Sequence, residues 1–206
     1  MKRLLACVAV LSVGVGRCQK VLKKTFVDSH ISTILIDTKN CYEVILQTSP
    51  SHELQVDATM EGEYSKDLLV ELEKDGKSVW VSTGFQPNFV FPNDKLSAHK
   101  VISIALRVRV PEYKKVQVFG TNSQVSVEGK YSDLNITLSD GDCRLYGVGE
   151  DVEVVTQKGD VWVNTTSGVF KAMSDYGKVH KTHLPLGNNH YNIQSKEGNI
   201  YLNKTK

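Results

Sequence analysis

Apolar and polar residues alternate with a fixed period in the C-terminal half of the chain. Five short segments align when their turn residues are superposed, and these anchor residues are Ser123, Gly141, Gly159, Gly177 and Gly198. The steps between consecutive anchors are therefore 18, 18, 18 and 21. Five segments that share one phase indicate an internal repeat.

Each repeat has apolar residues at alternate positions, the pattern of a strand with one buried face. Two residues after the anchors stand Val125, Cys143, Val161, Val179 and Ile200. Four residues after them stand Val127, Leu145, Val163, Lys181 and Leu202. Short strand pairs cannot bury such a face alone, so we expect coils that stack about 4.8 Å apart. The sequence thus predicts an all-β chain, a single-stranded β-helix or β-solenoid with about 18 residues per coil.

One residue breaks these columns. Lys181 stands where the repeat has an apolar side chain, and the extra residues of the last repeat fall in the same coil, between Thr182 and Asn189. We expect a bulging loop there that lets Lys181 reach solvent. The anchor glycines are expected to take a backbone conformation that other residues resist.

The N-terminal half is strand-like but less regular. Apolar runs such as Ile34–Ile36 and Val79–Val81 are separated by turn residues, and no stretch has a helical period. We expect residues 19–206 to form one domain, with irregular wider coils or a cap over 19–111 and the regular repeat over 112–206.

Several segments carry a family resemblance: Ile34–Asp37, Tyr42–Leu46, Leu106–Pro111 and Lys158–Val163. The chain resembles a bacterial family of β-strand-repeat proteins that are described as putative adhesins and likened to the head domain of auto-transporter adhesins. The resemblance covers roughly residues 25–206. It implies a β-helical fold and export, and it implies no established activity.

Residues 1–18 are expected to be a secretory signal peptide. A short positive start precedes the uncharged apolar run from Leu4 to Gly16. This run is shorter than the roughly 20 residues that a membrane-spanning helix needs. We expect no lipid anchor, because Arg17 precedes Cys18 where a small residue is required. The predicted location is secreted or extracytoplasmic, in the periplasm or on the outer surface.

The mature chain is close to neutral. Removal of residues 1–18 leaves 22 of the 25 basic residues against 23 acidic ones. Nucleic acids and anionic membranes attract basic surfaces, so neither is an expected partner. No later apolar run is long enough to span a bilayer. The sequence does not identify a partner, and a surface glycan and another protein are the two candidates.

Two cysteines remain in the mature chain, Cys41 and Cys143. An exported protein can join them in a disulfide. Alternatively, both are small buried side chains, and the repeat places Cys143 on the inward face. Spacing along the sequence does not decide between the two.

Candidate catalytic and metal-binding residues lie near the turns. Asp140, Asp142 and Asp160 could act as paired carboxylates in a small β-helix carbohydrate-active enzyme, but aspartate is also a common turn residue. His180 and His183 are three apart and would point to opposite faces of a strand, so no metal site is expected. We expect neither catalytic residues nor a cofactor.

The third residue after each anchor is predicted to point outward. The five residues of this column are Ser126, Arg144, Trp162, His180 and Tyr201. Trp162, His180 and Tyr201 would stack on the solvent face, and together with Arg144 they form a candidate ligand-binding surface. The alternative is cross-strand pairing that only supports the sheet.

These observations favour an exported, non-catalytic β-solenoid with an adhesin-like role at a cell surface. The first alternative is a glycan-binding module that uses the Trp162 face. The second is the carbohydrate-active enzyme that uses the three aspartates.

Overall fold

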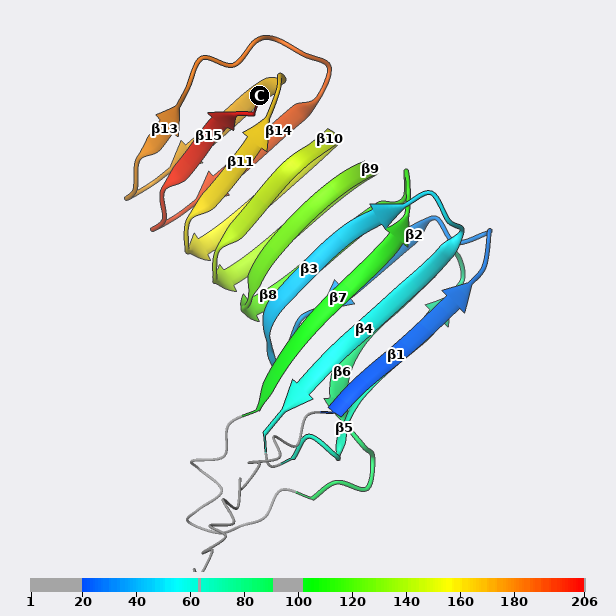
Figure 1. The fold of residues 1–206 in the computed structure, drawn as a ribbon. Helices are drawn as coiled ribbons and strands as arrows, with labels where there is room; N and C mark the ends of the chain where they lie inside the picture. The colour runs from blue at the N-terminus through cyan, green and yellow to red at the C-terminus, as the bar shows by residue number, and fades with distance from the viewer. Residues whose placement is uncertain (1–19, 63, 91–101, 206) are drawn as a thin grey trace, which may run out of the picture.

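The computed structural model describes residues 20–62, 64–90 and 102–205, in which every regular element is a β-strand (Figure 1). The predicted signal peptide lies outside these residues. The strands are β1 (Lys20–Val27), β2 (Thr33–Asp37), β3 (Cys41–Ser49), β4 (Glu53–Glu61), β5 (Leu68–Asp75), β6 (Ser78–Phe85), β7 (Ser103–Pro111), β8 (Lys115–Asn122), β9 (Gln124–Asp140), β10 (Cys143–Lys158), β11 (Val161–Thr165), β12 (Val169–Ser174), β13 (Val179–Lys181), β14 (His190–Ser195) and β15 (Ile200–Lys204). The all-β prediction is confirmed, and no described segment is a helix that could cross a bilayer.

The strands form an open sheet that folds back, so that two rows of strands face each other across a common core (Figure 1). One row runs β1–β4–β7–β3–β9–β10–β11–β15–β13. The other runs β5–β6–β2–β8–β9–β10–β14–β12. Strands β9 and β10 contribute to both rows, because their 17 and 16 residues are enough to cross from one to the other.

The parallel pairing in the centre of the sheet joins positions that stand 18 residues apart along the chain. Cys143 of β10 lies between Val125 of β9 and Val161 of β11, and all three are buried. In the second row, Leu134 of β9 pairs with Val152 of β10, again one repeat further along the chain. The apolar columns read from the sequence therefore line the core in this region.

The order of the last two repeats differs from the order along the chain. Val161 of β11 pairs with Ile200 of β15, and Val179 of β13 lies beyond Ile200. In the second row, Tyr191 of β14 separates Val152 from Phe170 of β12. The chain thus passes over one position after β11, forms β12 and β13 at the end of the sheet, and returns to fill the gap with β14 and β15.

This order changes the explanation for Lys181. The residue lies on β13, which pairs only with β15 among the described strands, and its side chain is exposed beside the buried Leu202. Lys181 reaches solvent because β13 is an edge strand, and the predicted bulge is not needed. The segment 182–189 instead carries the chain from this edge back to β14.

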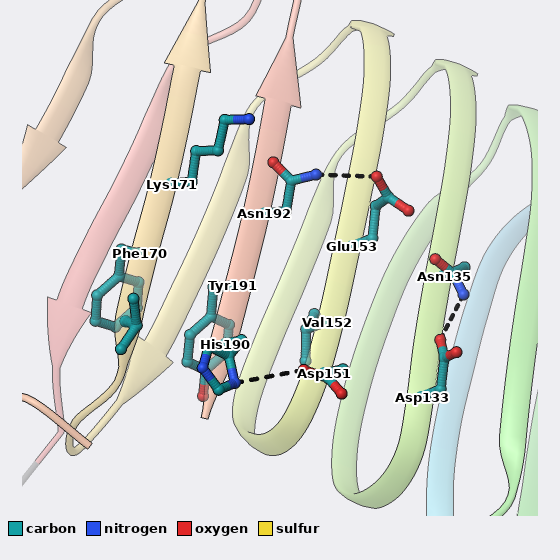
Figure 2. A pocket seen from close by; sticks show the side chains of 11 residues that line it. Asp133, Asn135, Asp151, Val152, Glu153, Phe170, Lys171, His190, Tyr191 and Asn192 are labelled. Carbon is teal, nitrogen blue, oxygen red and sulfur yellow. Dashed lines mark hydrogen bonds and ion pairs between the residues drawn. The ribbon is translucent and has the colours of Figure 1, made fainter. Parts of the chain in front are cut away.

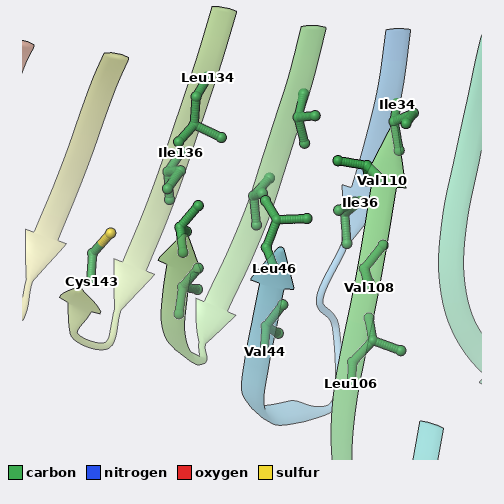
Figure 3. Close-up of a cluster of buried hydrophobic side chains, with 14 of the residues drawn as sticks. Ile34, Ile36, Val44, Leu46, Leu106, Val108, Val110, Leu134, Ile136 and Cys143 are labelled. Carbon is green, nitrogen blue, oxygen red and sulfur yellow. The ribbon is translucent and has the colours of Figure 1, made fainter. Parts of the chain in front are cut away.

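The N-terminal half mixes parallel and antiparallel strands. β2 lies between β6 and β8, and β3 lies between β7 and β9, all in parallel. β4 pairs antiparallel with β1 and β7, and β5 forms an antiparallel hairpin with β6. The apolar columns continue through this half: Figure 3 shows Ile36 of β2, Val44 of β3 and Leu106 of β7 in one core with Ile136 and Cys143.

The anchor residues form a column of neighbouring turns. In space its order is Ser123, Gly141, Gly159, Gly198 and Gly177, as the closest backbone neighbours show. Gly141 and Gly159 have positive φ angles of 135° and 118°, as expected for the turn, whereas Gly177 and Gly198 do not have a positive φ. A Cβ atom at Gly141, Gly159, Gly198 or Gly177 would overlap the carbonyl oxygen of the preceding member of the column. Close stacking of the turns therefore requires glycine.

Both cysteines are free and buried. Cys41 begins β3 and Cys143 begins β10, with β9 between these two strands. Burial raises the pKa of the Cys41 thiol to about 11 and that of the Cys143 thiol to about 12. Of the two possibilities open from the sequence, the structure has the buried thiols.

Candidate functional site

The predicted outward column forms a continuous stack in the order Arg144, Trp162, Tyr201 and His180. The Arg144 guanidinium lies 4.4 Å from the centre of the Trp162 ring. The rings of Trp162 and Tyr201 are stacked with centroids 5.3 Å apart, and those of Tyr201 and His180 are 4.9 Å apart. Parallel, in-register strands β10, β11, β15 and β13 produce this stack, because they place the four side chains side by side.

The stack covers most of its own ring faces. Trp162 lies between Arg144 and Tyr201, and Tyr201 lies between Trp162 and His180. Trp162 and Tyr201 are accordingly half-buried, and His180 is exposed. A ligand at this surface meets ring edges and the outer face of His180, so cross-strand stacking accounts for much of the arrangement. Ligand binding by the four residues stays a prediction.

The turn aspartates hold neighbouring coils together. Asp142 Oδ1 accepts a hydrogen bond from the backbone N–H of Asp160 at 3.0 Å, and Asp160 Oδ1 accepts one from the backbone N–H of Asn199 at 2.7 Å. Asp142 also contacts Arg144 at 3.1 Å. Asp140 is exposed at the end of β9. Two of the three candidate carboxylates therefore have structural partners that explain their presence.

The three C-terminal histidines do not converge. His180 belongs to the outward stack, His183 lies in the segment 182–189, and His190 begins β14 in the other row. Among the described residues, no group of three or more His, Cys, Asp or Glu side chains could hold a metal ion.

A groove of about 480 Å³ lies on the outer face of the second row, where β9, β10, β14 and β12 run side by side (Figure 2). Ligand pockets in proteins commonly have volumes of about 300–1,000 Å³. The residues that line it are Asp133, Asn135, Asp151, Val152, Glu153, Val169, Phe170, Lys171, His190, Tyr191 and Asn192.

Short polar contacts join the side chains of the groove, both within a strand and between neighbouring strands. His190 Nδ1 lies 3.4 Å from a carboxylate oxygen of Asp151, and Asn192 Nδ2 donates a 3.0 Å hydrogen bond to Glu153 (Figure 2). Asn135 Nδ2 donates to Asp133, which also pairs with Lys115 at 2.8 Å. These partners fix the orientation of the polar side chains.

An apolar wall closes the end of the groove at β12. The exposed side chain of Val169 forms this wall, whereas the ring of Phe170 packs against the core and is stacked on the buried Tyr191 with centroids 4.8 Å apart. Burial raises the pKa of the Tyr191 hydroxyl, which contacts Thr165 at 3.0 Å and also donates to the carbonyl of Val148. Tyr191 thus anchors β14 beneath the groove.

The groove was not predicted, although the repeat contains its signal. Eight residues before the glycine anchors stand Asp133, Asp151, Val169 and His190, and six residues before them stand Asn135, Glu153, Lys171 and Asn192. Along each strand both columns alternate with the inward-facing apolar residues, so their side chains point outward on the same face of the sheet. A survey of every outward column, and not only the aromatic one, would have found them.

No protein-family model matches the chain, and no curated protein matches its sequence. Among solved structures, it is similar to a putative cell adhesion protein from Clostridium sporogenes, with 17% identity over 91% of this chain and 100% of that chain and a TM-score of 0.59. It also matches a putative adhesin from Bacteroides fragilis (14% identity, 90% and 97% of the two chains, TM-score 0.39) and a putative lipid binding protein from Parabacteroides distasonis (11% identity, 94% and 98%, TM-score 0.30). The chain therefore shares the fold of the first of these proteins.

Proposed function

We propose that the protein is an exported, non-catalytic β-solenoid with an adhesin-like role at a bacterial cell surface. In this proposal residues 1–18 are removed as a signal peptide, and residues 19–206 form one domain with its regular coils over 112–206. The shared fold with a putative cell adhesion protein supports the proposal, as does the parallel pairing of equivalent positions in successive repeats.

The observation that carries the proposal is the groove on the outer face of the second row. It is built on four paired strands, which hold polar side chains in place without a loop that must close over them. Its carboxylates Asp151 and Glu153 are exposed to solvent. Such a surface is suited to binding a partner, whereas general acid catalysis by a carboxylate needs an environment that keeps it protonated.

A glycan-binding module that uses the Trp162 face is the second candidate function. The stacked Arg144, Trp162, Tyr201 and His180 support it, because they present aligned polar ring edges and one open ring face to solvent. The enzyme alternative has less support, since Asp142 and Asp160 already bind backbone N–H groups.

The proposal is tested by measuring adhesion directly. Beads coated with residues 19–206 are passed over surfaces that carry mucin, collagen or fibronectin, and retention under flow is compared with beads that carry an unrelated β-solenoid. We expect retention on at least one surface and competition by the soluble chain. Asn192→Arg, which fills the groove, should reduce retention, and Trp162→Ala should reduce it only if the second candidate is right. Retention equal to that of the unrelated protein on all surfaces would contradict the adhesin-like role.

A further inference from the structure

We propose that the groove across β9, β10, β14 and β12 binds a neutral or amino-sugar glycan and rejects anionic glycans. This inference rests on the proposed function and names the ligand class of its contact surface. It follows from three properties of the groove: the spacing of its planar polar groups, its apolar wall and its charge.

The floor of the groove carries planar hydrogen-bonding groups on consecutive strands. The paired residues are Asn135 of β9, Glu153 of β10 and Asn192 of β14, in direct register. Neighbouring strands are about 4.8 Å apart, so each group faces a different part of an extended ligand. Carboxamides both donate and accept, and a carboxylate accepts at two oxygens. Sugar hydroxyls also donate and accept hydrogen bonds, so they can pair with both the donors and the acceptors of the floor.

The apolar wall matches the other side of a sugar ring. Val169 is exposed at the β12 end and forms this wall, whereas the Phe170 ring packs against the core. A pyranose presents C–H groups on one face and hydroxyls around its edge. A small inorganic ion has no apolar surface to place against such a wall, and a purely apolar ligand would leave the polar floor without partners.

The charge of the groove selects among glycans. Asp133 is paired with Lys115, which lies outside the groove. The remaining charged groups of the groove are the carboxylates of Asp151 and Glu153 and the ammonium group of Lys171, and His190 lies beside Asp151. The net charge of these groups is therefore negative. Uronic acids and sulfated sugars would place like charges close to these carboxylates, whereas an ammonium group would be attracted. The side chains of Asp151 and His190 are 74% and 65% exposed, so salt should weaken this selection.

The experiment is a binding screen on an array that contains neutral, amino-sugar, uronic acid and sulfated glycans, followed by titration of the strongest ligand. Glu153→Ala and Asn192→Ala each remove one hydrogen-bonding group from the floor. We expect each to weaken binding about tenfold, the effect of losing one such bond to a polar ligand. Glu71→Ala is the matched control, because Glu71 is an exposed carboxylate of β5, at the opposite end of the row, and should leave binding unchanged.

A charge variant tests the selection separately. Asp151→Asn combined with Glu153→Gln keeps the shape of the groove and removes both carboxylate charges. Uronic acid or sulfated glycans should then bind where the parent chain rejects them. Preferential binding of sulfated glycans by the parent chain would overturn the inference, and so would neutral glycan binding that is unaffected by the floor variants.

The outcomes separate this inference from the adhesin-like role. If no glycan binds but the coated beads still adhere to collagen or fibronectin, the ligand class is wrong and the proposed function stands. If neither glycans nor any coated surface is bound, the proposed function fails as well. If Trp162→Ala abolishes adhesion and the floor variants leave it intact, binding is assigned to the aromatic stack.

Discussion

At the residue scale, the glycines of the anchor column allow the turns of neighbouring strands to approach closely. Gly159 lies between Gly141 and Gly198 in space, its φ is 118°, and a Cβ atom there would overlap the Gly141 carbonyl oxygen. Gly76 has a φ of 57°, but no atom lies within 4 Å of the place that its Cβ would take. Substitution of Gly76 therefore tests the cost of a strained backbone alone, whereas substitution of Gly159 adds the cost of a steric clash.

We predict that Gly159→Ala destabilises the fold much more than Gly76→Ala. The strained φ alone should cost about 1–2 kcal/mol in the free energy of unfolding. At Gly159 two coils must also move apart, so we expect a total above about 3 kcal/mol. Urea denaturation of both variants measures the difference. Equal losses would mean that the column tolerates a side chain and that only the φ angle matters.

The buried thiols predict alkaline instability. The pKa of Cys143 is about 12 in the folded chain against an ordinary value of 9.0. Below pH 9 the thiol is protonated in both states, and its contribution is complete. Above pH 9 the unfolded thiol ionises first, so stability falls with rising pH, by up to about 1.4 kcal/mol per pH unit.

Cys143→Val should remove this contribution while keeping an apolar, strand-compatible side chain. We expect a shallower fall in the free energy of unfolding between pH 9 and 11 than in the parent chain. Denaturation at several pH values measures both slopes. Parallel slopes would show that the thiol does not ionise differently in the two states.

At the element scale, the sequence pattern specifies which residues are equivalent but not which coils are neighbours. Val161, Val179 and Ile200 occupy the same column, and each could pair with either of the others without changing which face is buried. Periodicity therefore predicted the apolar columns, the turn glycines and the outward aromatic residues, but not the order of the last two coils.

Two features of the sequence relate to the parts of the structure that were not predicted, the strand order at the C-terminal end and the groove. Lys181 in a core column is tolerated only on a strand with one open side, so it marks the coil of β12 and β13 as terminal. The polar columns of the groove were equally visible. The groove itself was not, because Asn135, Glu153 and Asn192 are seen to be neighbours only when their strands are known to be adjacent.

The equivalence of the columns leads to a prediction about the end of the chain. Deletion of residues 190–206 removes β14 and β15, the only described neighbours of β12 and β13. Because the repeats share one phase, we expect β12 and β13 to move into the vacated place, with Val179 beside Val161. Protection of residues 169–181 from hydrogen exchange should then persist.

A cysteine pair reports this movement. In the full chain Tyr201 lies between Trp162 and His180, about two strand spacings apart, too far for a disulfide. In the truncated chain these positions become neighbours. Trp162→Cys with His180→Cys should therefore cross-link after truncation and not before. Deletion of residues 205–206 alone is the control and should not allow cross-linking. Rapid exchange over 169–181 without cross-linking would mean that the coil cannot reposition.

At the scale of the whole molecule, the open sheet has exposed edges that invite association. At the C-terminal end, β12 and β13 are each paired on one side only among the described strands. Val169, Met173 and Val179 are exposed at this end. Unprotected edges of this kind pair with other chains, and an inward-pointing lysine is a known means of preventing it.

We predict that Lys181 provides this protection. Its backbone pairs with Leu202 in the core column, and its ammonium group lies 5.5 Å from the centre of the Phe170 ring. A second copy stacked on this end would bury the ammonium without a carboxylate partner, at a cost of several kcal/mol. We therefore predict that the parent chain is monomeric and that Lys181→Val produces end-to-end dimers or longer assemblies.

The comparison that isolates the effect is with Lys178→Val, which removes the same charge from the exposed turn of the same coil. Sedimentation velocity over a range of concentrations should show association for Lys181→Val alone. Only position 181 lies in the core column, where a valine contributes about 1.5–3 kcal/mol on burial. If both variants remain monomeric, the segment 182–189 rather than the charge shields the edge. If both associate, net charge at this end matters and the inward position does not.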